Sequence, residues 1–93
     1  EAEIEVVEVS SGSLAECIAS KGIKMYGLTS SDNSNEQKAL FGDEFNKIDY
    51  IDCDENTVIC KENKIISYPT WVIDGKKYPG KYSLERLAEL ADC

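Results

Sequence analysis

Four cysteines are the residues of this 93-residue sequence best suited to chemistry: Cys17, Cys53, Cys60 and Cys93. An even number of cysteines in a small extracytoplasmic domain favours disulfide bonds. A zinc site is the alternative, and its usual signature is two close cysteine pairs with two to four residues inside each pair. The only close pair here, Cys53 and Cys60, is separated more widely than that. The spacing therefore favours disulfides, and we expect no metal.

Charge and composition narrow the possible functions. The sequence has no histidine, which removes histidine-based catalysis and histidine-ligated metals. Its net charge of −8 is opposite to the clustered positive charge that a nucleic-acid partner requires. We therefore expect no nucleic-acid partner, and no motif indicates a cofactor. No apolar run approaches the length of a membrane span, and no signal peptide is visible, so we expect any targeting segment to be removed or to lie outside this sequence.

Apolar periodicity and turn signals predict the elements that must position these residues. We expect strands at 4–9, 23–28, 48–53 and 70–73 and a short last strand beginning at Lys77. We expect helices at 14–21, 36–45 and 57–63, and a final helix capped by Ser83. Asp74 and Gly75 form a dipeptide typical of a tight hairpin turn.

Local signals add detail to two of the predicted helices. Ser13 and Glu16 have the spacing of a capping box, which predicts Ser13 as the N-cap of the first helix. Gly22 is placed to end that helix in the left-handed conformation. In the helix at 36–45, we expect Ala39, Leu40 and Phe41 to face the core.

The predicted order of elements is β-α-β-α-β-α-β-β-α. Strands separated by helices pair in parallel through right-handed crossovers, whereas the terminal hairpin is antiparallel. We therefore predict an α/β fold with a mixed central sheet flanked by helices on both faces. A single domain is expected over residues 1–93, with an N-terminal strand and turn at 1–12.

Several short motifs carry a family resemblance. They are Met25-Tyr26-Gly27, Ser31-Asp32-Asn33-Ser34, Gln37-Lys38-Ala39-Leu40-Phe41-Gly42, Tyr50-Ile51-Asp52-Cys53 with Cys60, and Ser67-Tyr68-Pro69-Thr70-Trp71-Val72-Ile73-Asp74-Gly75. Their order and spacing resemble the thioredoxin fold over about residues 14–91. Within that superfamily the chain is similar to the thioredoxin-like domain of bacterial and plant homologues of vitamin K epoxide reductase. The resemblance implies a thiol–disulfide oxidoreductase with a cis proline at Pro69.

The chain departs from this family at two positions. Members carry Cys-x-x-Cys where this sequence has Ser31 and Ser34, which we take as the positions of the active-site cysteines. Thiol–disulfide exchange needs a thiolate and a resolving cysteine, so a Ser-x-x-Ser form is predicted to be inactive in it. Laboratory substitution and a natural redox-inactive relative both explain the serines. Independently of the family, serines in a polar loop are ordinary helix-capping residues.

The resemblance also implies binding roles. Tyr68, Pro69 and Trp71 are expected to bind an extended peptide or a substrate protein with cysteines. Trp71 also fits a place in the core. A membrane-embedded quinone-reducing partner is implied too. The resemblance also implies an extracytoplasmic location, in the periplasm, at the cell exterior or in the thylakoid lumen. There the chain is expected to be the soluble part of a membrane protein.

The cysteines divide into one predicted pair and one open question. The strand-turn-helix expected between Cys53 and Cys60 favours a local disulfide over two buried free thiols. Cys17 and Cys93 lie on helices expected to cover opposite faces of the sheet, so the sequence leaves open whether they bond to each other. Two functions besides the oxidoreductase stay open, namely a redox-inactive peptide-binding module and a structural domain without such a site.

Overall fold

A computed structural model describes residues 11–93, so the predicted strand at 4–9 lies outside the described residues. The helices are α1 (Ser11–Ser20), α2 (Asp32–Phe41), the 3-10 helix η1 (Gly42–Lys47), α3 (Thr57–Glu62) and α4 (Leu84–Ala91). The strands are β1 (Lys24–Gly27), β2 (Asp49–Asp52), β3 (Thr70–Ile73) and β4 (Lys76–Pro79). None of the helices within residues 11–93 is long and apolar enough to cross a membrane.

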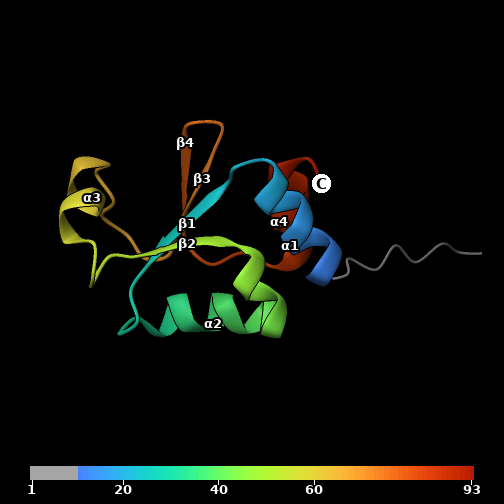
Figure 1. Ribbon diagram of the computed structural model, residues 1–93, viewed down its shortest axis with the longest axis horizontal. Helices are drawn as coiled ribbons and strands as arrows, with labels where there is room; N and C mark the ends of the chain where they lie inside the picture. Colours follow the sequence, from blue (N-terminus) through green and yellow to red (C-terminus); the bar gives the residue numbers. More distant parts are fainter. Residues whose placement is uncertain (1–10) are drawn as a thin grey trace, which may run out of the picture.

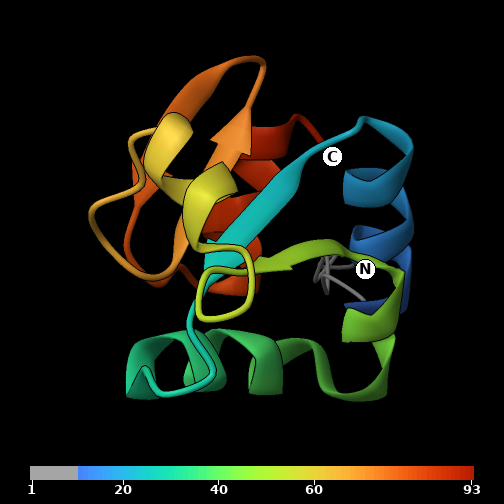
Figure 2. The same cartoon turned by 60° about the vertical axis from the view of Figure 1, so that its left-hand side comes forward.

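The strands form one mixed sheet in the order β2-β1-β3-β4. β1 pairs with β2 in parallel, while the β1–β3 and β3–β4 pairs are antiparallel. Asp74 and Gly75 both have positive φ and connect β3 to β4, as the predicted hairpin turn requires. Figures 1 and 2 show α3 and α4 on opposite sides of the sheet. The chain thus has the predicted α/β architecture of a thioredoxin-like fold.

Alternating residues of the strands divide the core into two clusters. Met25, Trp71 and Ile73 face the larger cluster. That cluster contains buried residues of α1, α2 and α4: Leu14, Ala15, Ile18, Phe41, Leu87 and Ala91. On the other face Tyr26 joins a smaller cluster with Cys53, Cys60 and Ile65. The period of two along the strands therefore decides which helices each strand residue contacts.

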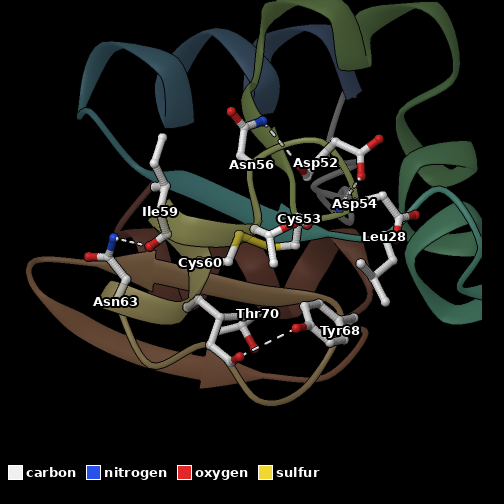
Figure 3. The surroundings of a disulfide bond; sticks show 12 residues. Leu28, Asp52, Cys53, Asp54, Asn56, Ile59, Cys60, Asn63, Tyr68 and Thr70 are labelled. Carbon is white, nitrogen blue, oxygen red and sulfur yellow. Dashed lines mark hydrogen bonds between the residues drawn. A yellow bond between two sulfur atoms is a disulfide. The ribbon is translucent and has the colours of Figure 1, made fainter.

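Two disulfides connect the described cysteines. Cys53 and Cys60 are bonded with an S–S distance of 2.04 Å, which is the pairing that the sequence predicted. Figure 3 shows this bond joining α3 to the turn that follows β2. Cys17 and Cys93 are also bonded, at 2.08 Å. Closing a loop restricts the unfolded chain, so each bond stabilises the fold.

The expectation that the helices bearing Cys17 and Cys93 cover opposite faces is wrong. α1 and α4 bury their apolar residues in the same cluster and lie side by side in Figure 1. The Lys21 ammonium at the end of α1 also donates to the carbonyl oxygens of Ala91 and Asp92, at 2.9 and 2.8 Å. This contact and the shared core bring the two cysteines together.

Helix boundaries differ from the prediction at both early helices. α1 includes Ser11 and so begins before Ser13, which is inside the helix rather than at its N-cap. Gly22 has φ of 70°, the predicted left-handed conformation. α2 begins at Asp32 instead of residue 36, and it gives way to a 3-10 helix at Gly42.

The buried face of α2 also differs from the prediction. Phe41 is buried as predicted, but Ser34 and Gln37 are buried with it, whereas Ala39 and Leu40 are exposed. The buried positions are spaced by three and four residues, as one helix face requires. Ser34 and Gln37 are polar, and their hydrogen bonds to other parts of the chain explain how polar side chains occupy core positions.

Candidate functional site

Ser31 is the N-cap of α2. Its backbone is extended, with φ of −92° and ψ of 124°, and its Oγ accepts a hydrogen bond from the Ser34 amide at 3.2 Å. The Ser31 carbonyl oxygen accepts from the Asn35 amide at 3.0 Å. Free amide groups and the helix dipole make this position favourable for an anionic side chain. The ordinary capping interpretation of Ser31 is therefore correct, and the same geometry would suit a thiolate.

Ser34 lies in the first turn of α2 and is completely buried. Its Oγ accepts a hydrogen bond from the Leu28 amide at 3.2 Å, which ties α2 to the end of β1. A Cβ added to Gly27 would stand 2.9 Å from Ser34 Oγ and 3.1 Å from Tyr50 Cε1. Glycine at position 27 is thus required for the close approach of α2 to the sheet.

The loop before β3 contains the predicted proline. The Tyr68–Pro69 peptide is cis, and Pro69 is fully buried. The Pro69 carbonyl oxygen accepts from the Gly80 amide at 2.7 Å, and the Thr70 hydroxyl donates to the Ser67 carbonyl at 2.7 Å. These bonds fix the loop on both sides of the proline.

The two candidate ligand-binding aromatic residues differ in accessibility. Tyr68 is half-buried and packs against the cluster that holds the Cys53–Cys60 disulfide, beside which Figure 3 places it. Trp71 has no exposed surface and belongs to the larger core cluster. Trp71 therefore has the place in the core that the sequence also indicated, and its expected peptide-binding role is wrong, because a fully buried side chain cannot line a groove. The fully buried side chain of Pro69 is excluded from a direct peptide contact for the same reason.

Gln37 was not singled out by the sequence, yet it connects α2 to two other parts of the site. Its Oε1 accepts hydrogen bonds from the Tyr82 amide at 2.8 Å and from Trp71 Nε1 at 3.2 Å. Its Nε2 donates to the Tyr82 carbonyl at 2.9 Å. A buried amide with all these partners holds the helix, β3 and the segment after β4 in one arrangement. No signal in the sequence pointed to this role, because both partners lie more than 30 residues away.

A charged group lies at the end of β2. The Asp52 carboxylate accepts hydrogen bonds from the Thr29 hydroxyl and from the Asp54 amide. The Thr29 hydrogen bond is the largest cause that lowers the pKa of Asp52, and main-chain donors and the Lys38 charge act in the same direction. Burial and the negative charge of Asp52 raise the pKa of the neighbouring Tyr50. The Lys38 ammonium stands 4.4 Å from the centroid of the Tyr50 ring.

Positions 31 and 34 carry hydroxyl groups where the family resemblance leads us to expect thiols. As the sequence stands, Ser31 and Ser34 cannot form a disulfide. Cys53 and Cys60 are both buried in their own disulfide and belong to the opposite core cluster from the buried end of α2. The described residues contain no group of three or more acidic, cysteine or histidine side chains able to hold a metal ion.

Sequence comparison with known proteins finds a relative whose name states an activity. The chain is 36% identical over 98 aligned residues to the thiol-disulfide oxidoreductase LTO1 of Arabidopsis thaliana. The alignment covers 89% of this chain and 26% of the relative, so the chain spans about a quarter of the length of the protein it matches. No protein-family model matches the chain. The similarity supports a thioredoxin-like oxidoreductase domain.

Proposed function

We propose that this chain is a thiol–disulfide oxidoreductase domain in which serine occupies both redox positions. The observation that carries the proposal is Ser31 at the N-cap of α2, with its Oγ accepting from the Ser34 amide. That position would stabilise a thiolate, which is the reactive form of cysteine. The similarity to a protein named as a thiol-disulfide oxidoreductase supports the same assignment.

The proposed reaction of the dicysteine form is a two-electron exchange. A thiolate of the substrate protein attacks the 31–34 disulfide, and one sulfur of the domain leaves as a thiolate. The second substrate thiolate then attacks the mixed disulfide and releases the domain as a dithiol. The substrate has lost two electrons and two protons and gained a disulfide. The domain holds two thiols, which a further acceptor must oxidise.

The acceptor and the location belong to the same proposal. We infer that a vitamin K epoxide reductase-like membrane partner removes the two electrons and passes them to a quinone. Two disulfides within residues 11–93 favour an oxidising compartment, so an extracytoplasmic setting suits the domain. The serine form would keep the fold and lack the exchange.

The test replaces both serines, as Ser31→Cys with Ser34→Cys. We expect the double variant to form a 31–34 disulfide that catalyses exchange with a reduced substrate, with the unsubstituted chain as the matched control. Asp32 adjoins the sulfur and opposes its ionisation, so the thiolate is stabilised less than in strongly oxidising relatives. We therefore expect a potential nearer about −270 mV than about −120 mV on equilibration with glutathione. A folded double variant that forms the disulfide and exchanges with no dithiol would refute the proposal.

A second candidate is a peptide-binding module without redox chemistry. The half-buried side chain of Tyr68 favours it, because part of its surface stays accessible to an extended peptide. Peptide binding by the serine chain, combined with an inactive double cysteine variant, would select this function over the first.

A further inference from the structure

A pocket is lined by residues other than the redox positions. It has a volume of about 380 Å³ and is partly open to solvent. The segment 64–67 after α3 forms one wall, and Thr70, Lys77 and Pro79 of the β3–β4 hairpin form the other. Neither Ser31 nor Pro69 lines it. Its size is within the range of ligand sites and accommodates a large apolar side chain with its main chain.

The pocket combines a buried apolar wall with an exposed apolar rim. Ile65 is buried in the smaller core cluster, whereas Ile66 has 88% of its surface exposed. Ile66 is the most exposed of the large apolar residues found on the described surface. Val58 and Ile59 of the preceding helix α3 are also exposed, at 67% and 46%. Several apolar side chains on one helix and the loop that follows it give a partner contact area beyond the pocket itself.

The charge of the pocket is opposite to that of the chain. The net charge is −8, yet the pocket carries two lysines, Lys64 and Lys77, and no acidic residue. The ion pairs among residues 11–93 involve Lys24, Lys47, Lys81 and Arg86. Lys64 and Lys77 belong to none of these pairs. In so acidic a chain, two unpaired cations beside one pocket indicate a negatively charged ligand.

The backbone of β4 determines how such a ligand is held. Gly80 donates its amide hydrogen to the Pro69 carbonyl, so in the antiparallel ladder the next pair, Thr70 and Pro79, is not hydrogen-bonded. The main-chain groups of Pro79 therefore point away from β3, at the free edge of the described sheet. Proline has no N–H there, which hinders addition of another strand. Recognition through the pocket and its side chains is favoured instead.

We propose that this pocket docks an acidic segment of a partner protein. A large apolar side chain of the segment enters between Ile65, Ile66 and Pro79, and flanking carboxylates pair with Lys64 and Lys77. The concave shape favours a peptide over the flat surface of a membrane. The site does not depend on the proposed oxidoreductase function, because no residue of α2 contributes to it, although Ser67 and Thr70 flank the loop that holds Pro69.

The test selects random seven-residue peptides from a display library on the immobilised chain. We expect enriched peptides that carry at least two acidic residues around a large apolar one. They should bind at least tenfold more weakly to a Lys64→Asn, Lys77→Gln variant. Asparagine suits position 64, where φ is +57°, so this variant keeps the fold. The matched control is Lys24→Gln with Lys76→Gln, which removes the same charge outside the pocket and should bind normally.

Ile66→Ser provides a second, uncharged variant. Because Ile66 is exposed, we expect unchanged unfolding and at least tenfold weaker peptide binding. Enriched peptides without an acidic bias, equal binding to both lysine variants, or no enrichment at all would overturn the proposal. Binding to vesicles of phosphatidylcholine with phosphatidylglycerol that requires Lys64 and Lys77, in the absence of any enriched peptide, would assign the pocket to a membrane surface and would also overturn it.

Discussion

Replacing Gln37 with leucine tests whether one buried amide holds the candidate site together. The substitution keeps a side chain of similar size and removes three hydrogen bonds, two to Tyr82 and one to Trp71. The indole N–H of Trp71 is then left in the core without an acceptor. The amide and carbonyl of Tyr82 lose their partners in a half-buried place that water can reach.

The expected loss of stability follows from these three groups. A buried polar group without a partner costs about 1–3 kcal/mol, so we take about 2 kcal/mol for the indole and about 1 kcal/mol for each group of Tyr82. Burying the leucine side chain offsets about 1 kcal/mol. The free energy of unfolding should therefore fall by about 3 kcal/mol. A domain of this size has only about 5–14 kcal/mol in total.

Urea unfolding followed by circular dichroism measures the change. We expect a lower midpoint with an unchanged slope, because the surface exposed on unfolding stays the same. The melting temperature should fall by roughly 12–24 °C. Glu36→Gln is the neighbouring control, since Glu36 pairs with Lys81 at the surface and such pairs contribute below about 1 kcal/mol. A loss below about 1 kcal/mol for Gln37→Leu would refute the idea that this amide connects the site.

Three further changes test other parts of the structure. Gly27→Ala should destabilise the chain by about 2 kcal/mol in urea unfolding, because the new methyl group would stand 2.9 Å from Ser34 Oγ; unchanged stability would show that α2 shifts freely. Thr29→Val removes the hydrogen bond that lowers the pKa of Asp52 most, so a carboxyl NMR titration should show this pKa raised toward 3.8; an unmoved midpoint would contradict the assigned cause. Because the lowered pKa gives stability that is present at neutral pH and lost as pH falls through it, the variant should also lose that stability. Cys93→Ser removes a disulfide between cysteines 76 residues apart and should lower the free energy of unfolding by up to about 4 kcal/mol. When both proteins are reduced, the variant and the unsubstituted chain should unfold with the same free energy.

The later elements of the fold could be predicted from sequence because local signals specify them. The strand at 70–73 has the predicted bounds, and Asp74 and Gly75 adopt the expected turn. Ser83 caps α4, with its Oγ accepting from the Arg86 amide at 3.1 Å. In each case the deciding contact lies within a few residues along the chain. The order and spacing of short motifs were likewise sufficient for the fold class.

The candidate site was predicted less completely, because its contacts are long-range. Ser34 and Gln37 are polar and were not placed in the core, since their burial depends on partners just after β1 and beyond β4. The family resemblance gave Trp71 a binding role beside its place in the core, and the choice between them depends on the contacts that Gln37 and Phe41 of α2 make with its ring. The Cys17–Cys93 bond required knowledge of which face α1 covers, and nothing in the local sequence specifies that.

The bond between Cys17 and Cys93 also determines how the domain responds to mechanical force. It joins α1 to the last residue of the sequence and encloses every strand of the described sheet. Tension applied between a point before Cys17 and the C-terminal residue passes through this covalent bond instead of through the hydrogen bonds of the sheet. A tethered domain of this kind would extend only by the chain before Cys17 while it remains oxidised. After reduction, the same tension would act directly on α1, the strands and α4.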